Sequence, residues 1–355
     1  MTQRNNAFSY LRVIAALAIV FLHTFQYMVE AFHVLGNDKI ASMCVRNSTL
    51  WAVPAFVLVS GALLLNPARE MTYKKLYGKY VLKIVIALFA SVIIYEIVDC
   101  FIFDKNINFE SFVRWMKALY TGNSWKPLWY LYMLLALYFM LPIYRRAAQA
   151  MNRSDFRYIV LVLIIFQSAI PFIEKLTGVR SGFYICVYAV YTLYFFAGYA
   201  IYKGHIVIRT LVAWILFILS SGANVLLTVL SFKGGLTSVY DAINNYASVI
   251  VVIQSLSLFA LFINRGRSAV EGNVSNEEVS ERPGVFGRLL LSIDKVTLGI
   301  YLVHLIILRV IIYAFKFNSY VYGFYMNVLL SIGIFAAAFI VSRILHLIPL
   351  VKKII

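Results

Sequence analysis

Two residues whose side chains can bind anions or move protons, Arg12 and His23, lie within the first apolar segment of the sequence. At about 100° per residue, the eleven steps between them return an α-helix to within about 20° of its start. If this segment is helical, both side chains lie on one face, about 16 Å apart along the axis. That separation is too long for direct contact and suits two ends of one elongated ligand.

Each of these two residues also has a simpler interpretation. His23 can be a buried histidine that is hydrogen-bonded to a neighbouring helix, and Arg12 can be an anchor whose side chain reaches toward the polar boundary of a membrane. Finding both on one face favours a shared functional role. Because histidine titrates near neutral pH, His23 is the candidate general base.

A basic stripe begins a later apolar segment. Lys75, Lys79 and Lys83 are spaced four residues apart, so a helix places them on one side. A positive stripe of this kind can bind lipid headgroups. It can also bind a phosphate-rich cofactor through charge-assisted hydrogen bonds, and the spacing alone does not separate these two interpretations.

Two further stretches combine aromatic residues with ionisable ones. The sequence Lys-Pro-Leu-Trp-Tyr-Leu-Tyr over 126–132 contains Trp129, which is typical of a membrane–water interface. The stretch Thr-Leu-Gly-Ile-Tyr-Leu-Val-His over 297–304 places Tyr301 and His304 on one helical face. His304 is therefore a second histidine expected inside an apolar helix.

A general base needs a partner that orients its ring. Glu96 and Asp99 are candidates for His23, because both are expected at a similar depth on a neighbouring helix. A carboxylate there would hold the ring tautomer and stabilise the imidazolium. The alternative is that Glu96 and Asp99 simply face water at the outer rim.

The composition shows what must position these residues. Hydrophobic residues make up 62% of the 355 residues and charged residues 13%, whereas soluble domains are roughly 45–50% apolar. An ordinary soluble enzyme is excluded, and the sequence predicts an all-α polytopic protein of about ten transmembrane helices. The expected spans are 7–28, 44–65, 79–102, 126–144, 157–173, 184–202, 208–232, 242–263, 294–315 and 323–346.

The basic residues indicate orientation in the membrane. Lys and Arg total 32 against 15 Asp and Glu, and they lie between the apolar runs, which indicates a lipid bilayer and no nucleic acid as partner. Lys and Arg are more frequent in the loops on the side of the membrane that holds the N-terminus than in the loops on the other side. Both termini are therefore predicted to be cytoplasmic. The whole chain, 1–355, reads as one membrane domain, with 264–293 expected as a flexible cytoplasmic loop.

Taken together, these motifs resemble the acyltransferase-3 family of bacterial integral membrane acyltransferases. Arg12 and His23 are similar to its R-x10-H signature, and Lys79 and Lys83 occupy its R-x-x-x-R position with Lys in place of Arg. Lysine keeps the charge but lacks the planar fork that fits phosphate oxygens. The remaining matches are Leu128–Leu131 and Gly299–His304.

The resemblance implies a membrane O-acyltransferase in the cell membrane. Such a protein moves an acyl group, often acetyl from acetyl-CoA, to a hydroxyl of a cell-envelope or lipid-linked carbohydrate. His23 would then be catalytic, Arg12, Lys79 and Lys83 would bind the donor, and Trp129, Tyr301, His304, Glu96 and Asp99 would line the site. No permanently bound cofactor and no metal are expected, because the three cysteines follow no metal-ligand spacing.

Two other classes of function fit parts of the pattern. A secondary transporter or a lipid-linked sugar flippase would also use buried His and Arg residues. Transporters often consist of two similar halves with broken helices, and no such halves are evident in this sequence. A ligand-binding sensory module is the third class, although no soluble effector region is evident.

The predicted orientation can be tested by cysteine labelling from outside the cell. In a variant without native cysteines, a probe site at Lys233 should react with an impermeant maleimide, and one at Ser275 should not. This follows from the excess of Lys and Arg in the loops that include 264–293. Labelling of the Ser275 site in intact cells would reverse the orientation.

Overall fold

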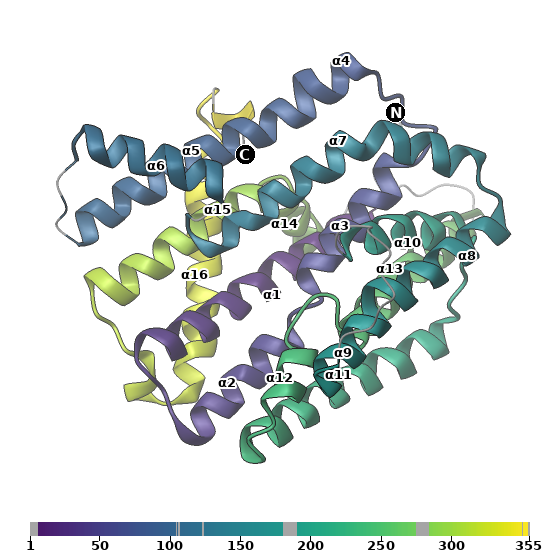
Figure 1. Ribbon diagram of the computed structural model, residues 1–355. Coiled ribbons are helices and arrows are strands. Elements are labelled where there is room, and N and C mark those ends of the chain that lie inside the picture. The colour runs from purple at the N-terminus through teal and green to yellow at the C-terminus, as the bar shows by residue number, and fades with distance from the viewer. Residues whose placement is uncertain are drawn as a thin grey trace.

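The computed structural model consists of helices, and among the residues that it describes there is no β-strand (Figure 1). It describes the chain except 1–5, 104, 106, 123, 180–189, 275–283, 350 and 354–355, and except the side chains of 267–274 and 353. The elements are α1 (Asn6–Ala31), α2 (Gly36–Ser48), α3 (Ala52–Leu64), α4 (Tyr73–Lys75), η1 (Leu76–Val81), α5 (Leu82–Ile102), α6 (Phe109–Thr121), η2 (Lys126–Leu128), α7 (Trp129–Ala150), α8 (Arg153–Ile164), η3 (Ile165–Ala169), α9 (Ile170–Thr177), α10 (Tyr191–Lys203), α11 (Thr210–Lys233), α12 (Thr237–Ile243), α13 (Val249–Val274), α14 (Val285–Asp294), α15 (Thr297–Arg309), η4 (Val310–Ala314), η5 (Ser319–Tyr322), α16 (Phe324–Leu345) and η6 (Val351–Lys353).

The expected all-α membrane architecture is confirmed. Within the described ranges, nine helical stretches are long and apolar enough to cross a membrane. α10 supplies a shorter crossing: the Arg153 side chain donates to the His205 carbonyl (3.2 Å), so α10 ends beside the start of α8. Thr177 lies at the far end of the same span that Arg153 begins, so the chain returns across the bundle before His205. The expected total of about ten spans and the cytoplasmic position of both termini stay predictions.

The segment 264–293, expected as a flexible loop, contains helix at both of its ends. α13 continues to Val274, and α14 begins at Val285. The residues between them, including the proposed labelling position Ser275, lie outside the described part of the chain.

The second span is a broken helix. The expected span 44–65 is instead a stretch from Gly36 to Leu64, divided into α2 and α3. Pro54 lies in the first turn of α3, where its missing N–H costs no helical hydrogen bond. The break leaves the last carbonyl groups of α2 without helical partners in an apolar bundle.

Side chains from neighbouring helices satisfy those carbonyl groups. Asn224 of α11 donates to the Asn47 carbonyl (3.3 Å), and Gln254 of α13 donates to the Ser48 carbonyl (3.4 Å). The Thr49 hydroxyl donates to the Arg46 carbonyl (2.8 Å). Because unpaired carbonyl groups are costly away from water, these bonds fix the break and the residues that flank it.

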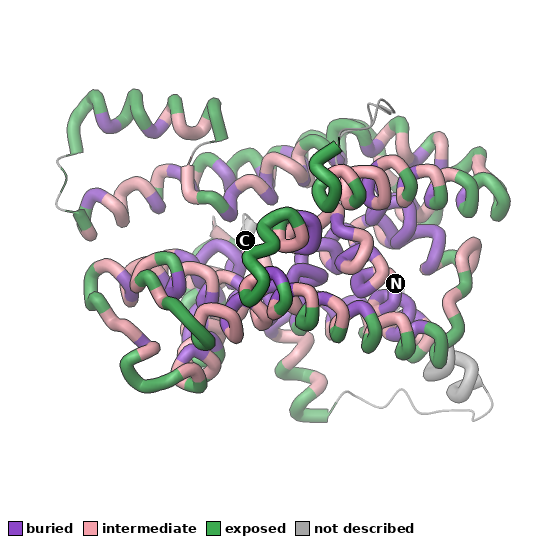
Figure 2. Tube along the Cα trace, turned by 60° about the horizontal axis from the view of Figure 1, so that its bottom comes forward, coloured by how far each residue is buried: buried purple, intermediate pink, exposed green. Residues whose placement is uncertain are grey.

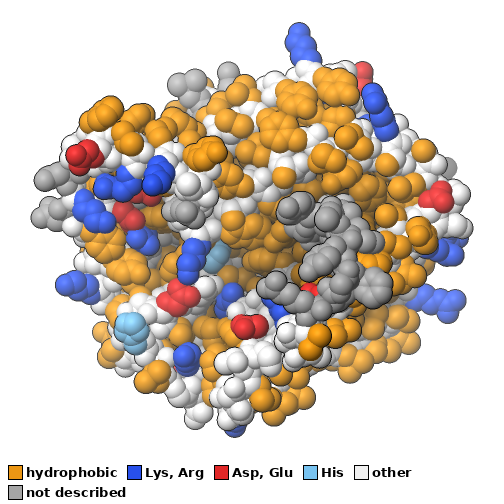
Figure 3. Space-filling model, in the orientation of Figure 1, with side chains coloured by type: hydrophobic (Ala, Val, Ile, Leu, Met, Phe, Trp, Pro, Cys, Tyr) orange, Lys and Arg blue, Asp and Glu red, His pale blue; other side chains and the backbone are white. Residues whose placement is uncertain are grey.

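α1 runs through the middle of the bundle and contacts α2, α3, α13, α14, α15 and α16 (Figure 1). Figure 2 shows the buried residues gathered along the inner helices, with exposed positions on the outer ones. α11 is an outer helix whose exposed side is apolar, with Leu211, Trp214, Ile218, Leu219 and Leu226 all exposed. Much of the surface seen in Figure 3 is apolar, as expected of a surface in contact with lipid.

α3 and α10 cross at van der Waals distance because each contributes a glycine at the crossing. A Cβ on Gly61 would overlap the carbonyl oxygen of Phe195, and a Cβ on Gly198 would overlap that of Leu58. Small residues allow this backbone approach, which is a usual way for membrane helices to associate.

Gly198→Ala should therefore destabilise the fold. Overpacking of this kind costs at least about 1–3 kcal/mol, so the thermal unfolding midpoint of the purified protein in detergent should fall. Gly222→Ala on α11 is the matched control, because nothing lies within 4 Å of its Cβ position. Alanine should be neutral or stabilising there, since it favours helix by about 1 kcal/mol over glycine. Equal midpoints for both variants would contradict the close crossing.

Candidate functional site

The two buried histidines that the sequence singled out meet at the centre of the bundle. His23 Nδ1 of α1 lies 2.9 Å from His304 Nε2 of α15, and the two rings are nearly parallel with centroids 5.2 Å apart. His304 is fully buried, and His23 is half-buried. The structure thus joins the motifs of the first and ninth expected spans.

The hydrogen bonds determine which nitrogen atoms carry hydrogen. His304 Nδ1 lies 2.9 Å from the Ile300 carbonyl oxygen, which can only accept, so Nδ1 of His304 donates. In the neutral ring Nε2 is then an acceptor, and His23 Nδ1 must donate to it. This leaves His23 Nε2 with a free lone pair. The pair therefore presents a base at His23 Nε2, and His304 supports the imidazolium that forms when this base takes up a proton.

The expectation that a carboxylate orients His23 is wrong in this structure, because His304 occupies that position. Asp99 instead forms a bidentate ion pair with Arg309 (2.5 and 2.7 Å) and accepts from the Trp125 indole (3.1 Å). Glu96 accepts from the Ser124 hydroxyl (3.5 Å). Both acidic residues are half-buried, so they are not simply exposed at a water-facing rim either.

Arg12 has a partner that the sequence did not indicate. Its Nε and Nη2 atoms donate to the two carboxylate oxygens of Asp294 at 2.7 and 2.9 Å, and the Asp294 side chain is fully buried. Bidentate geometry fixes the guanidinium plane and largely offsets its charge. Asp294 therefore holds the Arg12 guanidinium in a fixed orientation near the N-terminal end of α1.

A first pocket, of about 270 Å³, extends along the N-terminal half of α1. Arg12 and Lys83 contribute charge to its wall, and Ile19 and Tyr301 belong to its lining as well. Lys79, one turn before Lys83, is exposed and does not line the pocket. Of the two expected donor-binding lysines, the structure therefore brings only Lys83 together with Arg12.

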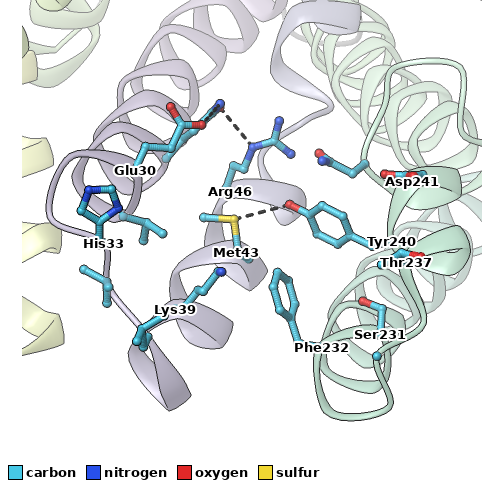
Figure 4. Close-up of a pocket in the computed structure, with 16 residues that line it drawn as sticks. Glu30, His33, Lys39, Met43, Arg46, Ser231, Phe232, Thr237, Tyr240 and Asp241 are labelled. Carbon is cyan, nitrogen blue, oxygen red and sulfur yellow. Dashed lines mark hydrogen bonds between the residues drawn. The ribbon is translucent and has the colours of Figure 1, made fainter.

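A second pocket, of about 860 Å³, opens along the C-terminal half of α1, where Gln26 and Glu30 are in its wall (Figure 4). α1 thus lines the first pocket up to Ile19 and the second from Gln26 onward. His23 lies on α1 between these two stretches. Along α1 the histidine pair therefore lies between the residues that line the two pockets, although neither histidine lines a pocket itself.

Aromatic residues pack around the pair. The Tyr301 ring lies 5.9 Å from the His304 ring and 5.3 Å from the Tyr130 ring, and its hydroxyl donates to the Pro127 carbonyl. The 126–132 and 297–304 stretches are therefore in direct contact. Trp129 packs instead against Tyr191 and Tyr246 (5.5 and 5.4 Å) and lies in the wall of neither pocket.

Sequence reasoning missed three partners at this site: Asp294, Arg309 and Arg46. Asp294 lies at the edge of the ninth expected span and Arg309 lies inside it. An ionisable residue in such a position usually needs a partner of opposite charge, and this signal could have indicated both pairs. The pairing itself, Asp294 with Arg12 and Arg309 with Asp99, depends on which helices are neighbours. Arg46 lies near the end of α2 and lines the second pocket.

The fold and the site define a multi-pass membrane protein with a proton-accepting imidazole pair between two pockets. A family model described as an acyltransferase domain, acyltransferase-3, matches residues 5–347, nearly the whole chain. The chain belongs to this family, as its motifs indicated, and is a membrane acyltransferase. This membership decides against the transporter and sensory alternatives. No curated protein and no solved structure matches the chain.

The hydrogen-bond chain predicts an unusual pair of ring tautomers. Nitrogen-15 spectra of histidine-labelled protein should show that His23 and His304 both carry hydrogen on Nδ1 when neutral. His304→Ala removes the acceptor of His23 Nδ1 and should shift the His23 signals, whereas His23→Ala should leave the His304 tautomer unchanged, since Ile300 holds it. A His23 ring that carries hydrogen on Nε2 in the neutral protein would contradict the assignment.

Proposed function

We propose that this acyltransferase of the cell membrane moves an acetyl group from acetyl-CoA, or another acyl group from its CoA thioester, to a hydroxyl of a cell-envelope or lipid-linked carbohydrate. The observation that carries the proposal is that the His23–His304 pair lies on α1 between the residues that line one pocket and the residues that line the other. One substrate can enter from each side and meet its counterpart at one base.

The first pocket fits the acyl-bearing arm of the donor. Its wall is largely apolar, with the cationic Arg12 and Lys83 also in its lining. CoA has phosphates at one end and a thioester at the other, joined by a flexible arm. With the phosphates near Arg12, the thioester lies about 16 Å further along α1, at the depth of His23. Asp294 keeps the Arg12 guanidinium in one orientation, and Lys83 supplies net positive charge.

His23 Nε2 acts as the general base. It removes the proton from the acceptor hydroxyl while that oxygen bonds to the carbonyl carbon of the thioester. The bond between carbon and sulfur then breaks, and the proton passes from His23 to the departing thiolate. During the step His304 Nε2 accepts from His23 Nδ1 and stabilises the imidazolium, the role that a carboxylate has in other His-centred sites.

A neutral partner has a consequence for catalysis. A carboxylate would attract the proton of the imidazolium more strongly than an imidazole does. His304 holds the His23 ring in one orientation and places no fixed negative charge beside it. That arrangement favours rapid return of the proton to the leaving group.

The donor site can be tested with two matched variants. Lys83→Gln should weaken acetyl-CoA binding by about tenfold or more, the loss expected for one charge-assisted hydrogen bond. Lys79→Gln removes the same charge one turn away, on an exposed side chain, and should have a smaller effect. Binding is measured by titration calorimetry, and Lys83→Arg should retain it. Unchanged affinity in both Gln variants would assign the two lysines to lipid headgroups.

The base is tested by substitution of His23. A general base contributes roughly 10²–10⁴-fold to rate, so His23→Ala should abolish measurable transfer from radiolabelled acetyl-CoA in membranes. Donor binding should remain, because Arg12 and Lys83 line the pocket on the other half of α1. His346→Ala, outside both pockets, is the control and should be fully active. Near-normal transfer by His23→Ala would remove the catalytic assignment.

A further inference from the structure

The second pocket is built from polar side chains of four helices, which is unusual within an apolar bundle. α1 contributes Gln26 and Glu30, α2 contributes Lys39 and Arg46, and α11 and α12 close the other side with residues such as Tyr240 (Figure 4). Its volume of about 860 Å³ is enough for an oligosaccharide segment.

Arg46 is the cation beside the His23 end of this pocket. Its Nε donates to Gln26 Oε1 (3.2 Å) and its Nη1 to Asn47 Oδ1 (2.7 Å). Both acceptors are neutral amides, and among the described residues Arg46 has no carboxylate within ion-pair distance. Its side chain is half-buried, so the protein holds a positive charge there that no direct ion pair among the described residues offsets.

The other charges of the pocket lie nearer to its mouth. Glu30 and Asp241 are exposed, and Glu30 accepts from the Gln26 side-chain amide (2.9 Å). Lys39 lies over the Phe232 ring at 5.7 Å. Neither exposed carboxylate forms an ion pair with Arg46, and Glu30 is connected to it only through Gln26.

Arg46 is also held close to the reacting centre. Gln26, which accepts from Arg46, follows His23 by one helical turn, about 4.5 Å along α1. By contrast, Arg12 and Gln26 are about 21 Å apart along the same axis, so donor phosphates at Arg12 do not reach Arg46. An anion bound by Arg46 would therefore belong to the acceptor and would lie near the hydroxyl that reacts.

We propose that Arg46 binds an anionic group of the acceptor, so that the protein selects acidic carbohydrates that carry a carboxylate or a phosphate near the modified hydroxyl. A guanidinium fits both groups through two parallel hydrogen bonds, and the broken second span fixes Arg46 through its carbonyl and its neighbour Asn47. This inference rests on the proposed function, because it assigns the second pocket to the acceptor.

The test compares three oligosaccharides that are identical except at one position. That position holds glucose in the neutral member, glucuronate in the second and glucose 6-phosphate in the third. Binding is measured in nanodiscs of neutral phosphatidylcholine, so that no lipid headgroup supplies a net negative charge. His23→Ala protein is used alongside the unmodified protein to separate binding from turnover. The acidic members should bind about tenfold or more tightly than the neutral one. The stronger of the two identifies carboxylate or phosphate as the preferred anion.

Arg46→Gln should remove the preference for the acidic oligosaccharides, and Arg46→Lys should keep part of it. Arg114→Gln, the same charge change on an exposed residue of α6, should keep it entirely. Equal binding of the three oligosaccharides by the unmodified protein, or no binding of the acidic ones, overturns the inference. So does a preference that survives in Arg46→Gln. Failure of acetyl-CoA to bind would instead overturn the proposed function, and the two results are measured separately.

Discussion

The hydrogen bond between His23 and His304 holds the two histidine-bearing motifs together across the centre of the bundle. Both rings lie among apolar helices, where a polar group without a partner is costly. Each ring therefore limits the orientation of the other. The Ile300 carbonyl accepts from His304 Nδ1 and so fixes which atom donates in each hydrogen bond of the pair. This one constraint determines the tautomer of His23, the ring nitrogen that keeps a free lone pair, and the relative position of α1 and α15.

α15 is tied to the bundle at both ends as well as at its middle. Asp294, just before it, pairs with Arg12 of α1, and Arg309 at its end pairs with Asp99 of α5. Arg309 also lies over the Trp125 ring at 4.4 Å. Breaking a buried ion pair leaves an uncompensated charge. The two pairs thus limit sliding or rotation of α15, which would otherwise move His304 relative to His23.

The polar break in the second span has a different role. Asn224 and Gln254 satisfy the carbonyl groups at the end of α2, so that a non-helical backbone is tolerated inside the bundle. The same break sets Arg46 at the wall of the second pocket. The close glycine crossing of α3 and α10 fixes the other half of this broken span. Tight packing on one side and paired polar groups on the other therefore fix the wall of the second pocket that contains Arg46.

The sequence by itself determined the helical membrane class, the family and most of the site's members, because these depend on local patterns. Apolar runs of spanning length, and the spacing between Arg12 and His23, are properties of single helices. It did not determine which helices are neighbours. The depth of Asp99 along its helix made it a plausible partner for His23. In the structure Asp99 pairs with Arg309, and His304 is the partner of His23. Such pairings depend on lateral packing between helices, which the periodicity of a single helix does not encode.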